Sequence, residues 1–574
     1  MSTKLKVVLC WHMHQPVYRD LHSNQYQLPW TYLHGIKDYV DMVAHLEAEP
    51  KAKAVVNFAP TLLEQIDDYA IQLNNYLTQC TDPKDAERFI HDPFLAALVK
   101  HPLAPFSQTA DLPEHEARLH FIELCLRANE ERLIQRFVPY QKLVKMVAWL
   151  KEKPDVLEYL SDQYFVDLIV WYHLAWMGET VRRSDSRVNA LMKKASGFDQ
   201  ADRRQLIELI HEIMSGLIPR YRALADKKQI ELSATPYAHP IVPLLLDVKT
   251  AAEAMPNVVL PTCGEYPGGQ ERVRWHVQKA FTVFQKYFGR IPQGFWPSEG
   301  GVSEAAIREL EKHGIRWVAT GHGVLHNSLI KCGLLEQPTH RAYRLPNSKV
   351  SCFFRDDHFS DLVGFEFFKW HADDAVAHLI HHLENIGNHL PPDQHVVSII
   401  LDGENAWEYY PENGYYFLSA LYKKLADHPH LELSTFSENL TTGVTELPKL
   451  VAGSWVYGSF STWIGSTDKN RGWDMLIEAK RVYDRVINTL STTQRQLAEQ
   501  QLAICEGSDW CWWFGDYNST NTVHDFDRLY RLHLTQLYYV LKQEPPEYLQ
   551  HIFSHGGGDP IAGGVMRTGQ ERKA

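Results

Sequence analysis

The sequence predicts an α/β protein built on a parallel sheet. Apolar, strand-like runs alternate with helical patterns along most of the chain, which is typical of strand–helix–strand units. The run Val396–Leu401 lacks polar alternation, as expected for a strand that is buried on both faces. Polar residues gather where several of these runs end, and chemistry in parallel α/β folds lies at the C-terminal ends of the strands.

The predicted strands come first in the argument because they position the candidate site. They are Lys6–Pro16, Ala54–Pro60, Gln229–Thr235, Gln293–Pro297, Arg316–Thr320, Ser351–Arg355 and Val396–Leu401. Helical patterns between the later strands cover Ser303–His313, Asp373–Glu384 and Gly414–Leu425. The Ser-Glu-Ala-Ala start of the first of these is a reasonable capped helix start.

Two other regions read as mostly helical. Residues 61–228 contain the helical patterns Glu116–Val138 and Asp155–Trp176, which predicts a helical insertion between two strands. Trp473–Leu502 and Asp525–Lys542 follow the last strand. We therefore expect a catalytic unit over 1–435 with its insertion at about 61–228, a helical region over 436–550 that contributes to the active site, and a glycine-rich, disordered tail over 551–574.

Bulk properties exclude several classes of function. The chain has 574 residues and a net charge of −12, which argues against a nucleic-acid partner because such a groove needs a basic face. No apolar stretch of about 18 residues predicts a membrane span. The short apolar run at the start reads as a strand rather than a signal peptide. The eight cysteines form no Cys-x-x-Cys pair, so we expect a cytoplasmic protein with free thiols, and the oligomeric state stays open.

Two carboxylates are the leading catalytic candidates. Glu299 follows the strand-like run Gln293–Pro297, and Asp402 directly follows Val396–Leu401. An acid at the end of a buried strand is rigidly placed and can hold an unusual pKa, and a pair of such acids is what the cleavage of glycosidic bonds needs. Each acid alone could equally be an ordinary turn residue.

Further polar residues accompany the pair. His12 and His14 lie two apart on a predicted strand, so they share a face, and Asp402 and Glu404 can do the same. A rival interpretation is a zinc site made by the His-x-His pair with Asp402, Glu404 or His239, which zinc analysis of the purified protein would test. No phosphate-binding glycine loop and no Gly-x-Ser-x-Gly turn is present.

Several of the 16 tryptophans stand beside polar turns, where an aromatic face could stack on a sugar ring. They are Trp11, Trp296, Trp407, Trp455, Trp463, Trp510, Trp512 and Trp513. The alternative for each of them is a place in the hydrophobic core.

Five motifs together give a family resemblance. They are Trp11-His-Met-His-Gln-Pro16, Gln229-Ile-Glu-Leu232 with the following Thr235-Pro-Tyr-Ala-His-Pro, Trp296-Pro-Ser-Glu299, Asp402-Gly-Glu404 and Cys505-Glu-Gly-Ser-Asp-Trp510. With them the chain resembles the family 57 glycoside hydrolases, particularly the amylopullulanase and α-amylase-like branch, over about residues 5 to 540.

The resemblance implies a fold, a reaction and a set of residues. The implied fold is an incomplete (β/α)7 barrel followed by a helical region that closes the active site. The implied substrates are α-glucans, cleaved with retention and without a cofactor or metal. Glu299 would be the nucleophile and Asp402 the general acid/base. The resemblance implies that His14, Glu231, Glu404 and Asp509 hold the sugar. The predicted substrate-contacting set also includes His12, His239 and Trp296, together with Trp407 and Trp510, which we infer from their position and aromatic character.

Three functions stay open on the sequence. A hydrolase would cut α-1,4 bonds in starch, glycogen, pullulan or maltodextrin, with activity on α-1,6 bonds undecided. A 4-α-glucanotransferase or a branching enzyme would use the same covalent intermediate and pass the glucosyl group to a sugar hydroxyl. An inactive glucan-binding protein is the alternative from a different class, and a starch digestion would separate it from the enzymes.

Overall fold

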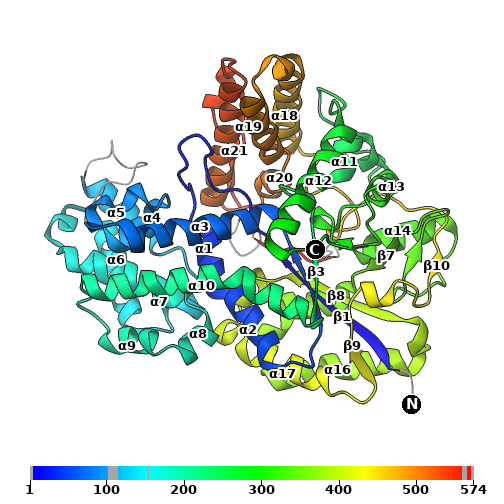
Figure 1. Ribbon diagram of the computed structural model, residues 1–574, viewed down its shortest axis with the longest axis horizontal. Helices are drawn as coiled ribbons and strands as arrows, with labels where there is room; N and C mark the ends of the chain where they lie inside the picture. The colour runs from blue at the N-terminus through cyan, green and yellow to red at the C-terminus, as the bar shows by residue number, and fades with distance from the viewer. Residues whose placement is uncertain (1–3, 101–113, 153, 559–564, 570–574) are drawn as a thin grey trace.

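A computed structural model describes residues 4–100, 114–152, 154–558 and 565–569, and a curled, mostly parallel sheet lies at its centre (Figure 1). The central strands run in the spatial order β8-β1-β2-β3-β4-β5-β7, and every neighbouring pair in this series is parallel. They are β1 (Leu5–Met13), β2 (Ala54–Phe58), β3 (Ile230–Ala234), β4 (Gly294–Phe295), β5 (Trp317–Thr320), β7 (Ser351–Phe354) and β8 (Val396–Asp402).

The ring of strands is not closed by a full ladder. Between β7 and β8 the described chain has only the isolated bridge Arg355↔Ser398, supported by a 2.7 Å hydrogen bond from the Asp356 amide to the Ser398 carbonyl. This arrangement confirms the predicted α/β class with an incomplete (β/α)7 barrel. The peripheral strands are β6 (Tyr343–Arg344), antiparallel to β7, β10 (Thr445–Glu446), parallel to β6, and β9 (Leu431–Leu433), parallel to β1.

The register between β1 and β8 positions the chemistry. The two strands pair from Lys6↔Val396 to His12↔Asp402, so the last residue of β8 stands beside His12. The Gly403 amide continues the ladder with a 2.7 Å hydrogen bond to the His12 carbonyl. Because both strands are buried almost throughout, this register is fixed by the core on either side of the sheet.

Helices cover the outside of the sheet. Those that follow the strands of the barrel are α1 (Trp30–His34), α2 (Val40–Ala48), α11 (Val242–Leu246), α12 (Gly269–Phe288), α13 (Glu304–Lys312), α14 (His322–Cys332), α15 (Asp357–Asp361), α16 (Ala372–His389) and α17 (Tyr415–Ala426). The three helices predicted between the later strands are therefore present as α13, α16 and α17, with ends shifted by a few residues.

Between β2 and β3 the described chain is helical and extends to one side of the sheet (Figure 1). Its helices are α3 (Pro60–Gln79), α4 (Pro93–Val99), α5 (Glu114–Leu124), α6 (Val138–Glu152), α7 (Asp162–Trp176), α8 (Glu179–Ser184), α9 (Ser186–Lys194) and α10 (Gln200–Asp226). The prediction of one helix over Glu116–Val138 is wrong. The chain breaks after α5, and Asn129 caps the following turn by accepting the Arg132 amide at 2.9 Å.

After β10 the chain forms a second helical group, which stands above the sheet in Figure 1. Its helices are α18 (Thr467–Val486), α19 (Thr492–Cys505), α20 (Asp509–Trp513) and α21 (Thr520–Val540). The helical stretch predicted over Trp473–Leu502 consists of two helices, because Ser491 accepts the Gln494 amide and starts a new one.

The predicted disordered tail needs correction as well. Parts of it make defined contacts: Ser554 and Gly569 are buried, and the Gly557 and Gly558 amides donate to the Asn518 carbonyl at 3.1 and 3.0 Å. The remainder of the predicted tail lies outside the described residues. Within the described chain no helix is both long and apolar enough to cross a membrane. All eight cysteines are free thiols.

Candidate active site

A cavity of about 530 Å³ lies where the C-terminal ends of the strands meet the C-terminal helices. Its size is in the usual range of small-molecule sites, about 300–1,000 Å³. The polar residues that line it come from distant parts of the sequence and include His12, His14, Glu299, Asp402, Glu404, Asn405 and Asp509, and its tryptophans include Trp455, Trp512 and Trp513. Both predicted catalytic carboxylates therefore face one space.

Glu299 is held in a strained turn. It lies in the short 3-10 turn Ser298–Gly300 after β4, with the left-handed backbone angles φ 56° and ψ 28°. This conformation is costly for a residue with a side chain and is often found at functional sites. Trp455 fixes the turn, because its amide donates to the Glu299 carbonyl at 3.2 Å and its indole Nε1 donates to the carboxylate Oε2 at 3.0 Å.

The environment of Glu299 changes its acidity. Burial raises the pKa of Glu299 to about 8, and the charge of Asp402 acts in the same direction. The hydrogen bond from Trp455 and the charge of His14 oppose that shift. A nucleophilic carboxylate must be ionised, so a raised pKa confines the reactive form of Glu299 to higher pH.

Asp402 ends β8 and accepts a 3.0 Å hydrogen bond from the Asn405 side-chain amide. Burial raises the pKa of Asp402, while the Asn405 hydrogen bond and the charges of His14 and Arg355 lower it. Glu404 lies only two residues away, but it is not among the main causes of this shift. The structure assigns it mainly to burial, and the Asp402 charge instead adds to the burial that raises the pKa of Glu404.

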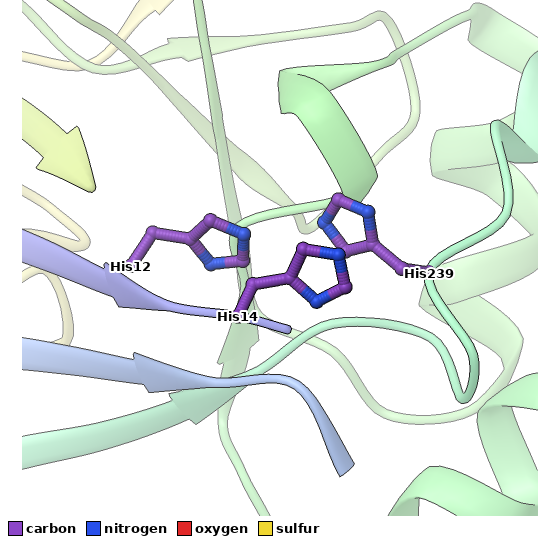
Figure 2. Close-up of side chains that lie close together, drawn as sticks. All are labelled: His12, His14 and His239. Carbon is purple, nitrogen blue, oxygen red and sulfur yellow. The ribbon is translucent and has the colours of Figure 1, made fainter. Parts of the chain in front are cut away.

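Three histidine rings form a stack beside the carboxylates. Figure 2 shows His12, His14 and His239 gathered with their rings facing the same space, and the His14 and His239 ring centroids lie 3.8 Å apart with an interplanar angle of 19°. His12 and His14 come from the β1 end and line the cavity, whereas His239 comes from the turn after β3. The shared face predicted for His12 and His14 is thus present.

The stack holds its charge on one ring. Burial lowers the pKa of His12 to about 3, and burial with the charge of His14 lowers the pKa of His239 well below its usual range. Burial also disfavours protonated His14, but a 2.6 Å hydrogen bond to Asp509 and the charges of Asp509, Glu299 and Asp402 outweigh it and raise the His14 pKa. Within this stack, His14 is therefore the imidazolium candidate, and Asp509 of the C-terminal region holds it.

The histidines also bear on the zinc interpretation. His12 Nε2, His14 Nδ1 and His239 Nε2 lack hydrogen-bond partners, and these groups could offer ligand atoms within 4.8 Å of one another. A zinc ion needs nitrogen ligands at about 2.0–2.1 Å in tetrahedral directions. The lone pairs lie in the ring planes, so the face-to-face rings of His14 and His239 point them side by side rather than at one ion. The stacked geometry is therefore unlike that of a tetrahedral zinc site.

Two polar predictions need correction. Glu231 does not line the cavity, since it is the second residue of β3 and its carboxylate accepts hydrogen bonds from Trp317 Nε1 at 2.8 Å and from the Ser437 amide at 2.9 Å. His239 is fully buried behind His14, and its Nδ1 is 2.8 Å from Ser508 Oγ and 3.9 Å from Glu299 Oε1. His239 supports the site, and Glu231 supports the base of the barrel.

The tryptophan predictions divide into two groups. Trp407 and Trp510 are core residues: Trp407 is 1% exposed and packs on Trp11, and Trp510 is 2% exposed and packs on Tyr530. The prediction that they stack on substrate is wrong. Trp296 does not reach the main cavity and lines a small pocket beside it. The neighbours Trp512 and Trp513 of the predicted cluster do line the main cavity.

Two functional contacts were not predicted from the sequence. Asn405 holds Asp402, and Trp455 holds Glu299 through both its backbone and its indole. The contact of Asn405 with Asp402 could have been predicted, because Asn405 stands three residues after Asp402 in the same turn. Trp455 is 156 positions from Glu299, and its only sequence signal is a tryptophan in a glycine-flanked turn.

The strand ends of this barrel bring two carboxyl groups with raised pKa to one polar and aromatic cavity. This is the kind of site found in enzymes that act on glycosidic bonds. The model of Glycosyl hydrolase family 57 matches residues 8–449, and the chain belongs to this family.

Solved structures share the fold. The chain is similar to the GH57-type branching enzyme from Pyrococcus horikoshii, with a TM-score of 0.53, 15% identity and coverage of 97% of this chain and 99% of that one. For a GH57 branching enzyme from Thermococcus kodakaraensis the TM-score is 0.51 and the identity 15%, with 93% of this chain and 90% of that one covered. For the α-amylase AmyC from Thermotoga maritima the TM-score is 0.50 and the identity 12%, with 94% of this chain and 97% of that one covered. No curated protein matches the sequence.

Proposed function

We propose that this enzyme cleaves α-1,4 glucosidic bonds of α-glucans such as starch, glycogen or maltodextrin by double displacement with retention. The observation that carries the proposal is the meeting of Glu299 and Asp402 in one cavity with the His14–Asp509 pair. Burial raises the pKa of both carboxyl groups. Such a pair can divide the roles, with one group ionised as the nucleophile and the other protonated as the acid.

In the first step the Glu299 carboxylate attacks the anomeric carbon, and protonated Asp402 gives its proton to the departing glycosidic oxygen. The bond from carbon to the leaving oxygen breaks as the glucosyl–Glu299 ester forms. The indole N–H of Trp455 on Oε2 holds the attacking carboxylate in position. The strained turn keeps the residue from rotating away.

In the second step ionised Asp402 removes a proton from the acceptor hydroxyl, which attacks the anomeric carbon and releases Glu299. Asn405 orients Asp402 in both steps. His14, charged through Asp509, and Glu404 are placed to hold hydroxyl groups of the sugar in the cavity. His12, which is neutral, adds a further polar contact at the strand end.

The acceptor decides the reaction catalysed. Water gives an α-amylase-type hydrolase, and a sugar hydroxyl gives a 4-α-glucanotransferase or a branching enzyme. Transfer is the second candidate because two proteins with this fold over nearly their whole length are branching enzymes. Both reactions share every step up to the covalent intermediate.

The test is to incubate the enzyme separately with maltoheptaose, amylose and pullulan, and to separate the products by chromatography. Hydrolysis gives only shorter products, chain transfer gives some longer than maltoheptaose, and branching gives new α-1,6 linkages in amylose. NMR of the first product should show the α anomer. A β first product, or no reaction with any of the three glucans, would rule out the proposal.

A further inference from the structure

A short segment near the end of the described chain borders the active site. Val565 lines the main cavity, while Met566 and Arg567 line a smaller pocket with Asp402 and Trp455. We call Val565–Gly569 the C-terminal segment. It lies outside the matched family region, which ends at residue 449, and more than 160 positions from Asp402.

Arg567 anchors the C-terminal segment to the tryptophan wall. Its guanidinium carbon lies 4.5 Å from the Trp512 ring centroid and 4.6 Å from that of Tyr517, which is the geometry of cation–π contacts. Its two terminal nitrogens donate to the Trp512 carbonyl and to Thr462 Oγ1, both at 3.1 Å. Charge, stacking and hydrogen bonds therefore fix this side chain together.

Gly569 forms the second anchor. Its amide donates to Asp361 Oδ2 at 3.1 Å, and its carbonyl accepts the Tyr457 amide at 3.0 Å. A Cβ at this position would come within 2.5 Å of Asp357 Cγ and 2.8 Å of an Arg355 nitrogen. The close approach requires glycine, because any side chain would push the segment off this surface.

Both anchors reach the catalytic carboxylates through direct contacts. Trp512, under Arg567, is stacked on Trp455 with ring centroids 6.5 Å apart, and Trp455 donates to Glu299. Asp361, which holds Gly569, pairs with Arg355 at 2.7 Å, and the charge of Arg355 lowers the pKa of Asp402. The C-terminal segment thus packs on the residues that hold the catalytic pair.

The space available on the two sides of the cavity differs. Under Met566 and Arg567, beside Asp402, the remaining pocket measures about 10 Å³. Elsewhere the main cavity continues into a groove of about 60 Å³, and the two spaces share Leu28, Arg127 and Asp525 in their linings. The space beside the C-terminal segment is therefore smaller than the space toward Leu28, Arg127 and Asp525.

We propose that the C-terminal segment is a specificity wall, which limits the length of glucan that can bind beside Asp402. The proposal rests on the α-glucan activity proposed above. The segment borders the cavity and the small pocket beside Asp402, and the contacts of Arg567 and Gly569 hold it there. Displacing it opens further space for glucosyl units and favours long substrates over short ones.

The experiment compares wild type with Arg567→Ala, which removes the stacked anchor, and with Gly569→Val, which creates the clash with Asp357. For each, kcat/KM is measured on maltotriose and on soluble amylose. Both variants should raise the amylose-to-maltotriose ratio by about tenfold, the effect expected for gaining roughly one binding subsite. The matched control Arg204→Ala removes a half-exposed arginine from α10 and should leave the ratio unchanged.

An unchanged ratio in both variants overturns the proposal. So does loss of activity on both glucans in variants that melt at the wild-type temperature, because the segment would then serve catalysis rather than chain length. Should Gly569→Val fail to fold, Arg567→Ala decides alone. If wild type cleaves neither glucan, the proposed function has failed, and calorimetric binding of maltotriose and maltoheptaose to wild type and Arg567→Ala still tests the wall: unchanged relative affinities reject it.

Discussion

The floor and the roof of the cavity are built in different ways. The floor consists of strand-end residues: His12, His14, Glu299, Asp402 and Glu404. The roof consists of Trp455, Asp509, Trp512 and Val565, from the chain after the barrel. Floor residues lie at the ends of strands or in the turns directly after them, whereas roof residues come from loops, a five-residue helix and the C-terminal segment.

This difference separates two tasks. The floor carries the groups that can make and break bonds, since both catalytic carboxyl groups stand on it. The roof sets their state: Trp455 stabilises ionised Glu299, and Asp509 charges His14. We therefore expect floor substitutions to remove the chemistry and roof substitutions to shift its pH dependence or its substrate range.

The largest effect is expected for Glu299→Gln on the floor. The amide cannot form the glucosyl ester, so kcat should fall by about 10⁴-fold or more, as for other catalytic nucleophiles. The measurement is single-turnover cleavage of maltoheptaose at the optimal pH. Glu336→Gln, an exposed glutamate, is the matched control and should retain wild-type activity. Near-wild-type activity of Glu299→Gln would remove it as nucleophile.

The next effect concerns Asp402→Asn. General acid/base groups contribute about 10²- to 10⁴-fold, so kcat should fall by about 10³-fold. The loss should be smaller for a donor with a good leaving group, such as an aryl maltoside, whose first step needs little protonation. Steady-state rates with an aryl maltoside and with maltoheptaose make the comparison. Equal losses on both donors would contradict the acid role.

The floor was largely predictable from the sequence. The apolar run that ends in Asp-Gly-Glu predicts both the strand β8 and the acid at its end. The His-x-His spacing on β1 predicts that the two histidines share a face. Glu231 shows the limit. The spacing placed it on a strand but not at which end, and its position as the second residue of β3 puts it at the start of the strand.

The roof could not be derived in the same way. Trp407, Trp510 and Trp512 all stand beside polar turns, yet only Trp512 faces the cavity, because long-range packing decides which ring is covered. The C-terminal segment belongs to the stretch 551–574, whose glycine-rich composition is typical of a disordered tail. Its order comes from contacts with Asp361 and Trp512, which no local pattern contains.

An intermediate effect is expected for Asp509→Asn on the roof. Without this charge and its hydrogen bond, burial dominates and the pKa of His14 falls, so the ring becomes neutral at lower pH. A charged hydrogen bond is worth about 1.5–3 kcal/mol, which corresponds to a loss in kcat/KM of about 10- to 100-fold. NMR titration of His14 should show the lower pKa. An unchanged titration would separate Asp509 from the charge of His14.

The smallest effect is expected for Trp455→Phe, and it appears as a shift rather than a loss. The indole N–H stabilises the Glu299 carboxylate, whose pKa burial already raises to about 8. Glu299 must be ionised to attack, so activity rises as the pH passes through its pKa. Removing the donor raises that pKa further, and the acidic limb of kcat/KM should move to higher pH by about half a unit.

The matched control for this shift is Trp370→Phe, since Trp370 is 40% exposed and stands apart from the described lining of the cavity. Its pH profile should coincide with that of wild type. A limb that stays in place in Trp455→Phe would mean that the indole only packs against the turn. A limb that moves to lower pH would mean that the indole favours protonated Glu299. The roof would then hinder the ionisation of the nucleophile on the floor instead of promoting it.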